Sequence, residues 1–279
     1  MKIAVTGAGG YLGRGVVKNL IERGHDVVAS DFRSDRIDSR AAAVPCDLFA
    51  LEDPYEELGC PDVLLHMAWR DGFSHYSDAH IDDLPRHYDF IRKMMESGVK
   101  KVAVMGSMHE VGFYEGSINE ATPCWPVTPY GISKNALRAL VENLAKKQEV
   151  GFQWLRGYYI VGNDVNGASI FSKIAAAVAK GQDTFPFTMG QNQYDFIDYP
   201  DFCLKVAEAV EQDDVVGVIN ICSGRPEKLA DRVERFIAEN GYDIKLEYGA
   251  FPDRPYDSKA VWGDSSKIDI IERLAAAEA

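Results

Sequence analysis

Short apolar runs alternate with segments of helical periodicity along the first half of the chain. Five aliphatic runs have the length and composition of buried strands: residues 2–6, 26–29, 63–67, 101–105 and 153–155. Three segments repeat apolar residues every three or four positions, which predicts helices: residues 11–23, 84–97 and 135–148. Alternation of strand and helix is typical of a parallel, doubly wound sheet. The sequence therefore predicts the α/β fold class.

The pattern changes after about Gly162. The segments expected there are helices at 171–180, 201–211 and 229–240, strands at 217–221 and 245–248, and polar irregular stretches at 182–193 and 254–266. No internal repeat or low-complexity linker separates this part from the first. We expect a first domain over residues 1–162 and a smaller interwoven lobe over 163–279, with about 195–222 returning to the first domain.

Composition narrows the class of partner. The chain has 279 residues, 46% apolar and 26% charged, which are ordinary values for a globular protein. Thirty basic against 43 acidic side chains leave a net charge of −13. Such a surface repels nucleic acid and anionic lipid, so we expect neither as a partner and a small molecule instead.

Cysteine spacing and the N-terminus favour the cytoplasm. The five cysteines are scattered, and no two have the CxxC spacing of a zinc site or a redox motif. We therefore expect reduced thiols, no disulfide framework and no metal. No signal peptide is predicted, and no apolar run approaches the ~20 residues of a membrane span.

A glycine-rich segment, TGAGGYLG, follows the first predicted strand and opens the first predicted helix. Gly7, Gly10 and Gly13 have GxxGxxG spacing. The first permits a tight turn, the second lets the backbone approach a pyrophosphate, and the third lets helix and strand pack closely. The helix N-terminus, at Tyr11 and Leu12, adds unpaired N–H groups and a positive dipole end. We expect a dinucleotide to bind here.

The end of the second strand bears on which dinucleotide binds. A carboxylate at Asp31 can accept both hydroxyls of an adenosine ribose and repels a 2′-phosphate, which favours NAD. Arg33 and Arg36 are close enough to bind a phosphate, so NADP stays as the weaker alternative. Asp47, next to Leu48, is either an acceptor for the adenine amino group or an ordinary turn residue.

A third group of residues predicts acid–base chemistry. Tyr130 and Lys134 form YxxxK at a helix start, so they share one face. An ammonium beside a phenol lowers the pKa of the phenol, as does an oxidised nicotinamide, which suits Tyr130 as acid or base. Ser107 follows a predicted strand 23 residues earlier, at the sheet edge where ligands bind, and can hold the substrate oxygen.

Taken together, these motifs resemble those of an extended short-chain dehydrogenase/reductase of the NAD-dependent epimerase/dehydratase family. The matching segments run in the family's order: TGAGGYLG, HMAW at 66–69, GSMHEVG at 106–112, PYGISK at 129–134, LRGYYIVG at 155–162, DFIDYPDF at 195–202 and INICSG at 219–224. The resemblance implies a Rossmann domain that binds NAD(P), a substrate-binding lobe and a nucleotide-sugar substrate. It also implies a homodimer.

The resemblance assigns roles to single residues. Ser107, Tyr130 and Lys134 would form the Ser-Tyr-Lys triad. Residues that would lie under or beside the nicotinamide are His66, Met67, Ala68, Trp69, Gly157 and Tyr158. Residues that would face the substrate are Ser107, Glu110, Tyr159 and, for the diphosphate, Arg254. Met67 and Trp69 are larger than the residues common at their positions.

The resemblance also bears on the reaction. Dehydratases of this family place an acidic pair, or a glutamate, directly after the catalytic hydroxyl residue, whereas Met108 and His109 stand here. We therefore expect a nucleotide-sugar 4-epimerase or 4-ketosugar reductase rather than a 4,6-dehydratase. Two alternatives remain: a redox-sensing regulator that binds the cofactor without turnover, and a reductase of a non-nucleotide carbonyl compound.

The dimer has a sequence argument of its own. Helix 135–148 carries an apolar stripe wider than one sheet face needs: Ala136, Leu137, Leu140, Val141, Leu144 and Ala145. We expect this stripe and residues 90–95 to form a four-helix interface.

Overall fold

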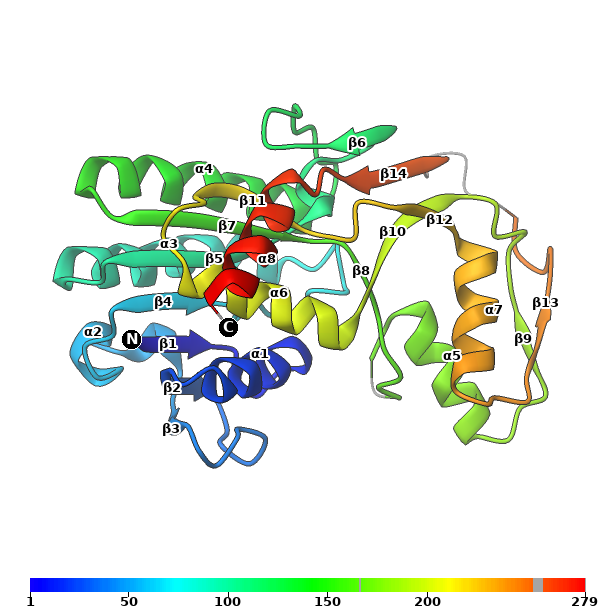
Figure 1. Ribbon diagram of the computed structural model, residues 1–279, viewed down its shortest axis with the longest axis horizontal. Coiled ribbons are helices and arrows are strands. Elements are labelled where there is room, and N and C mark those ends of the chain that lie inside the picture. Colours follow the sequence, from blue (N-terminus) through cyan, green and yellow to red (C-terminus); the bar gives the residue numbers. More distant parts are fainter. Residues whose placement is uncertain (166, 253–257, 279) are drawn as a thin grey trace.

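The computed structural model describes residues 1–165, 167–252 and 258–278. A larger domain is built on a seven-stranded sheet, and a smaller lobe lies beside it (Figure 1). The sheet consists of β1 (Lys2–Thr6), β2 (Asp26–Asp31), β3 (Ala42–Pro45), β4 (Val63–His66), β5 (Lys101–Ser107), β7 (Gly151–Gly157) and β11 (Gly217–Ile221). Its order is β11-β7-β5-β4-β1-β2-β3, and all neighbours are parallel. The predicted doubly wound α/β fold is confirmed.

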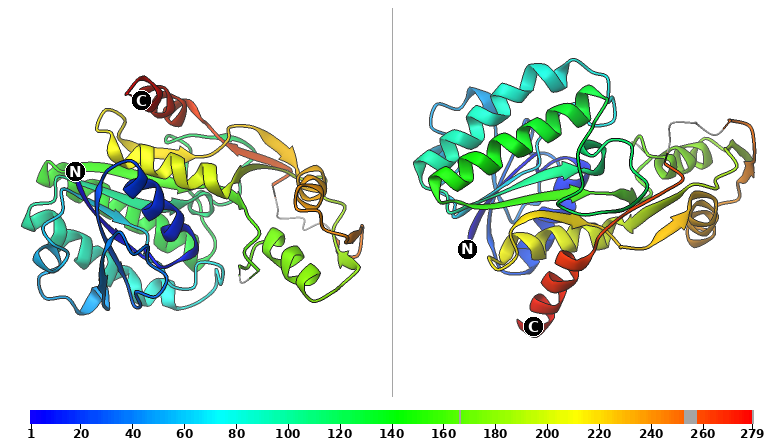
Figure 2. Two further views of the ribbon diagram at one scale, coloured as in Figure 1. Left: turned by 60° about the horizontal axis from the view of Figure 1, so that its bottom comes forward. Right: turned by 90° about the horizontal axis from the view of Figure 1, so that it is seen from above.

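Helices cover both faces of this sheet (Figure 2). On one face lie α1 (Tyr11–Glu22), α6 (Tyr199–Glu211) and α8 (Ser266–Glu278), and on the other α2 (Pro54–Glu57), α3 (Ala79–Ser97) and α4 (Pro129–Gln148). Successive strand residues point to opposite faces, so Ile3 and Val5 belong to one apolar cluster and Ala4 to the other. Because both faces are covered, these strands are apolar throughout rather than alternating.

The smaller lobe combines a mixed sheet, a two-stranded sheet and two helices. The mixed sheet has the order β12 (Pro226–Lys228), β10 (Gln193–Asp198), β14 (Ala260–Gly263) and β6 (Gly116–Ile118), and β8 (Tyr159–Val161) pairs with β10. The other elements are β9 (Thr184–Pro186), β13 (Lys245–Glu247), α5 (Ile170–Ala179) and α7 (Leu229–Glu239). Since β6 comes from the first half of the chain, the lobe is interwoven with the sheet domain.

One buried carboxylate joins the strands of the lobe. Asp195, on β10, has no exposed surface. It accepts hydrogen bonds from the backbone N–H groups of Ser223 at 2.8 Å, Gly224 at 2.9 Å and Gly263 at 3.1 Å. A buried carboxylate costs free energy unless it is fully hydrogen-bonded, and these donors meet that need. The contacts fix the turn after β11 against β14.

Several predicted boundaries are wrong. The segment 254–266, expected as a polar loop, contains β14 and the start of α8, and 182–193 contains β9. These short strands gain their hydrogen bonds only from distant partners: Val261 of β14 pairs with Gly116 of β6. Helix α3 begins at Ala79 rather than near residue 84. The sequence did not predict this earlier start, because the first turns of the helix are polar and carry little apolar periodicity.

Among the described residues, the structure contains no helix with the length and apolar character needed to cross a bilayer. All five cysteines are free thiols.

Candidate active site

The glycine-rich segment forms a tight turn between β1 and α1. Gly7 has φ +70°, and a Cβ there would come within 2.8 Å of the Ala68 backbone nitrogen. A Cβ on Gly13 would lie 2.2 Å from the Gly7 carbonyl oxygen. Around Gly10, the N-cap of α1, a Cβ would meet only the Gly7 carbonyl oxygen within 4 Å, at 3.1 Å. Gly7 and Gly13 therefore permit close packing. Gly10 leaves the N-terminus of α1 open to an anion, which fits a pyrophosphate.

Asp31 ends β2 and holds this turn. Its Oδ2 accepts from the Gly9 N–H at 3.0 Å, and its Oδ1 accepts from the Phe32 N–H at 2.7 Å. Each carboxylate oxygen has a second lone pair, so the group can still accept ribose hydroxyls. Arg33 is exposed and forms an ion pair with Asp35, with 3.0 Å between Nε and Oδ1.

The residues expected near the adenine lie in a second turn. Asp47 is the N-cap of the 3-10 turn η1 (Leu48–Ala50) and accepts from the Phe49 N–H at 3.0 Å. Leu48 is buried. Arg36 is exposed. Asp47 also forms an ion pair with Arg86, with 3.7 Å between Oδ2 and Nη2, and its contact with adenine stays a prediction.

Ser107 and Tyr130 come together where β5 ends and α4 begins. Ser107 is the last residue of β5 and the N-cap of the turn η2 (Met108–Glu110), and its Oγ accepts from the His109 N–H at 3.3 Å. Tyr130 lies in the first turn of α4, which the Thr128 side chain caps by accepting from the Gly131 N–H at 3.2 Å. The Ser107 side chain lies close enough to the Tyr130 hydroxyl to lower its pKa.

Lys134 lies one turn further along α4 and is buried. Its Nζ donates to the Met105 carbonyl oxygen at 2.7 Å. Burial lowers the pKa of Lys134 to about 7, with the Glu110 charge acting in the opposite direction. Burial also raises the pKa of Tyr130, and the nearby Ser107 side chain only partly offsets this. The expected lowering of the Tyr130 pKa is therefore wrong for the protein by itself, because desolvation disfavours a phenolate and the Glu110 charge adds to the rise.

The segment after β4 lies against the glycine turn. Met67 and Ala68 donate backbone N–H groups to Thr6 Oγ1, at 3.2 and 3.3 Å. The Thr6 hydroxyl also bonds His66 Nδ1 at 2.9 Å. Trp69 follows at the same sheet edge and stands next to Lys134. The structure therefore brings this segment, the glycine turn and the triad together along the carboxyl ends of β1, β4 and β5.

The residues at and after the end of β7 face two different parts of the protein. Gly157 pairs with Ser107 across the sheet. The Tyr158 ring lies against β14, where a Cβ on Gly263 would be 2.9 Å from its Cζ. Its side chain is therefore directed to the lobe, and only its backbone adjoins the predicted nicotinamide site. Tyr159 is partly buried, with its ring 4.6 Å from that of Tyr194.

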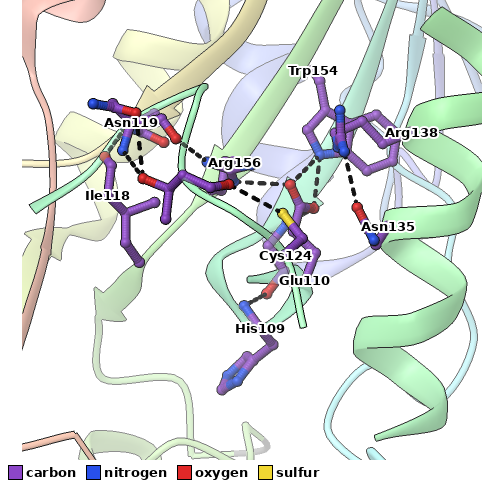
Figure 3. Close-up of polar contacts among 12 residues, drawn as sticks. His109, Glu110, Ile118, Asn119, Cys124, Asn135, Arg138, Trp154 and Arg156 are labelled. Carbon is purple, nitrogen blue, oxygen red and sulfur yellow. Dashed lines mark hydrogen bonds and ion pairs between the residues drawn. The ribbon is translucent and has the colours of Figure 1, made fainter. Parts of the chain in front are cut away.

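Glu110 does not have the environment of a sugar contact. It has no exposed surface, and its Oε1 pairs with Arg156 Nε at 2.8 Å. Trp154 Nε1 donates to both carboxylate oxygens, at 2.9 and 2.7 Å (Figure 3). The Ser107 N–H donates to Oε2 at 3.2 Å. The carboxylate is fully engaged inside the protein, which argues against the expected contact with sugar hydroxyls.

Arg156 was not singled out from the sequence, although a signal exists. A lone arginine stands in β7, which is otherwise largely apolar and buried, and such a cation requires a buried partner. Its Nη1 also donates to the Asn119 carbonyl oxygen at 3.2 Å. Arg156 thus positions the turn that carries Ser107, and it connects this turn to the segment after β6.

Histidine rings surround Tyr130. The His75 ring stacks on it, with centroids 4.9 Å apart and planes 8° apart, and the His75 carbonyl accepts from the Tyr130 N–H at 3.1 Å. The His80 and His109 rings lie at 5.2 and 6.2 Å. Burial lowers the pKa of His109 to about 4 and also lowers that of His75. Burial therefore favours the neutral form of the His75 and His109 rings beside Tyr130. From the sequence, His80 and His109 were possible contacts of sugar hydroxyls, whereas His75 was not singled out.

Arg254, the expected diphosphate contact, lies outside the described residues. Among those that are described, no cluster of His, Cys, Asp and Glu side chains has the arrangement of a metal site.

Residues 3–222 match the NAD dependent epimerase/dehydratase family. A curated relative, the dTDP-6-deoxy-L-talose 4-dehydrogenase (NAD(+)) of Aggregatibacter actinomycetemcomitans, is 42% identical over 269 residues. The alignment covers 94% of this chain and 99% of the relative.

Solved structures share the fold at lower identity. A UDP-N-acetylglucosamine 4-epimerase from Methanobrevibacter ruminantium, in complex with UDP-N-acetylmuramic acid, has a TM-score of 0.81 at 21% identity, covering 97% of this chain and 91% of that one. A UDP-glucuronic acid 4-epimerase from Bacillus cereus, in complex with UDP-glucuronic acid and NAD, has a TM-score of 0.79 at 20% identity, covering 98% and 93%.

The buried ion pair makes a testable prediction. Glu110→Gln leaves the Arg156 charge uncompensated, so we expect unfolding to become easier by about 3–5 kcal/mol. The double variant Glu110→Leu/Arg156→Met removes both charges. Its loss of unfolding free energy should be smaller than the sum of the losses in Glu110→Leu and Arg156→Met. Urea denaturation followed by circular dichroism measures each value. Glu96→Gln, in an exposed pair with Arg92, is the matched control and should cost at most about 0.5 kcal/mol. Additive losses in the double variant would contradict the coupling.

Proposed function

The chain belongs to the NAD-dependent epimerase/dehydratase family, and on this premise we propose that it is an NAD-dependent oxidoreductase acting at C4 of a dTDP-linked 6-deoxyhexose. The reaction interconverts the 4-hydroxyl and the 4-keto sugar. The observation that carries this proposal is the 42% identity, over nearly the whole of both chains, to a relative named for that activity. Of the two reactions expected from the sequence, this relative favours the ketoreductase, run in either direction, over the epimerase.

The residues at the sheet edge fit NAD. The open N-terminus of α1 at Gly10 would hold the pyrophosphate, and Asp31 the adenosine ribose. The segment 67–69 and Lys134 would line the nicotinamide end. NAD, when bound, supplies the hydride acceptor or donor. The protein contributes binding, orientation and proton transfer.

Tyr130 is proposed to exchange the proton of the sugar 4-hydroxyl. In oxidation the Tyr130 oxygen takes this proton as C4 loses its hydrogen, and in reduction it returns the proton to the 4-keto oxygen. The Ser107 hydroxyl, which lies close enough to Tyr130 to lower its pKa, would donate to the same sugar oxygen and hold it in place. Burial raises the pKa of Tyr130, and in the proposed reaction the charge of Lys134 would oppose this rise and favour the phenolate.

The same geometry disfavours elimination of water. Met108 follows Ser107 directly, is buried and has no transferable proton. The nearest carboxylate in sequence, Glu110, is held by Arg156 and Trp154. A 4,6-dehydratase needs a further acid and base beside the site, and the turn after Ser107 offers no accessible carboxylate.

We place the protein in the cytoplasm, because its cysteines are free thiols and a reducing compartment keeps them so. We also propose a homodimer through α3 and α4, on a smaller apolar surface than the sequence suggested. Most residues of the expected stripe are buried within the subunit and are not available to a partner. They are Leu137, Val141, Leu144 and Ala145 on α4, and Phe90, Ile91, Met94 and Met95 on α3. Ile132 and Leu140, two turns apart on α4, are each 45% exposed and remain for a partner.

The first prediction tests the reaction and the acid–base residue. Purified protein with NAD and dTDP-6-deoxy-L-talose should form NADH and a 4-keto sugar. Tyr130→Phe should lower kcat by about 10²–10⁴-fold, because it removes the proton-transferring hydroxyl. Its NADH affinity, titrated by fluorescence, should stay near that of the wild type. Tyr55→Phe on α2 is the matched control. Conversion between C4 epimers without net NADH would assign an epimerase, and full activity in Tyr130→Phe would remove this residue from the mechanism.

The second prediction concerns the cofactor. We expect at least tenfold tighter binding of NADH than of NADPH, because the Asp31 carboxylate repels a 2′-phosphate and Asp35 pairs with Arg33. Asp31→Asn should narrow this preference by weakening NADH binding. Fluorescence titration of both nucleotides measures it. A tenfold preference for NADPH in the wild type would show that the arginines dominate.

The third prediction tests assembly by light scattering at micromolar concentration. The wild type should have the mass of a dimer, and Leu140→Glu should shift it toward the monomer by placing charges in the interface. Leu204→Glu, at an exposed position of α6 on the opposite face, should remain dimeric. A monomeric wild type would reject the proposed dimer.

A further inference from the structure

Trp69 lies where the resemblance places the floor of the cofactor site, but one of its contacts is with the catalytic lysine. The Lys134 Nζ is 3.8 Å from the centroid of the indole ring. The same ammonium group donates to the Met105 carbonyl oxygen at 2.7 Å. Since Lys134 is buried, an aromatic face and a carbonyl replace water around its charge.

The indole ring is held at its edge and on its face. Its Nε1–H donates to His80 Nδ1 at 3.0 Å, and His80 Nε2 bonds the Ser74 carbonyl oxygen at 3.1 Å. A carbonyl oxygen only accepts, so His80 Nε2 carries the proton and Nδ1 is free to accept from Trp69. The His87 ring stacks on the indole, with centroids 4.5 Å apart and planes 9° apart. These contacts fix the plane of the ring beneath the ammonium group.

The titratable groups that interact with Lys134 come from β4, α3 and η2: His66, His87 and Glu110. On its own helix, Tyr130 lies one turn before it. Burial lowers the pKa of His66 to about 3 and also lowers that of His87, so neither ring adds positive charge at pH 7. His66 Nε2 and His87 Nδ1 are 2.8 Å apart and form one neutral hydrogen bond. Glu110 favours the ammonium form of Lys134, whereas burial opposes it more strongly.

We propose that Trp69 is a positioning residue that keeps Lys134 as an ammonium group, by a cation–π contact whose ring plane His80 and His87 determine. The inference rests on the proposed function, since it concerns the lysine that supports proton transfer at Tyr130. An aromatic face stabilises the cation but not the neutral amine, so it opposes the cost of burial. A large aromatic residue at position 69 thereby keeps the buried lysine charged.

The direct test needs no substrate or cofactor. The Lys134 Nζ is titrated by NMR in protein labelled with ¹⁵N-lysine, and its signal is assigned by its absence in Lys134→Met. Trp69→Leu removes the aromatic face, so we expect the pKa of Lys134 to fall by about one unit. Trp69→Phe keeps a weaker face and should give a smaller fall. An unchanged Lys134 titration in Trp69→Leu overturns the inference.

The pH profile of kcat is the second measurement. If turnover needs the ammonium form, kcat falls as the pH rises through the pKa of Lys134, and this fall should move to lower pH in Trp69→Leu, with Trp69→Phe between. A role as cofactor floor alone would instead weaken NADH binding and leave the profile in place, which would overturn the proposal. Thermal unfolding checks that each variant folds, and Trp69→Phe carries the test if Trp69→Leu does not.

The two proposals fail separately. Normal turnover of the dTDP-sugar with no change in the Lys134 titration rejects the role of Trp69 and leaves the proposed function intact. The expected Lys134 shift in a protein that does not oxidise the sugar supports the contact and rejects the proposed function.

Discussion

A carboxylate and a guanidinium, both shielded from solvent, meet beside the ends of β5 and β7. Glu110 and Arg156 have at most 1% of their side-chain surfaces exposed, and Trp154 donates to the same carboxylate. Such a pair gains little net stability over apolar residues of the same size, but the loss of one partner is severe. Its effect here is geometric. Glu110 accepts from the Ser107 N–H and so fixes the turn that carries the proposed catalytic hydroxyl of Ser107.

The parallel sheet brings the rest of the site to the same edge. Thr6 is paired with His66 and His66 with Val104, whereas Ser107 is paired with Gly157, so β5 and β7 extend three residues beyond the ends of β1 and β4 at the same edge. The groups that follow these strands are the glycine turn, the segment 66–69, the turn of Ser107 and the residues after β7. Helix α4 covers one face and presents Tyr130 and Lys134 to this edge. Ligands bind at this edge in open α/β sheets because loops of variable sequence leave the rigid strands there.

Charge at the site is controlled more by burial than by pairing. The protein carries a net charge of −13, which repels anions. The backbone N–H groups at the N-terminus of α1 are nevertheless suited to bind one. Burial keeps His66, His87 and His109 neutral at pH 7 and brings the pKa of Lys134 down to about 7. The Trp69 face and Glu110 act in favour of the ammonium form.

What the sequence by itself determined is local. Aliphatic runs and helical periodicity predicted the strands and helices of the first domain, and glycine spacing located the anion-binding turn, since these signals depend on neighbouring residues. The YxxxK pair was predictable for the same reason, because four residues make one helical turn. The tertiary structure alone decided what Glu110 does, because its partner Arg156 is 46 positions away and belongs to another strand. The tertiary structure likewise determined that β14 forms, since it pairs with β10 and β6, and that histidines gather around Tyr130. Those contacts join segments that are far apart in the sequence.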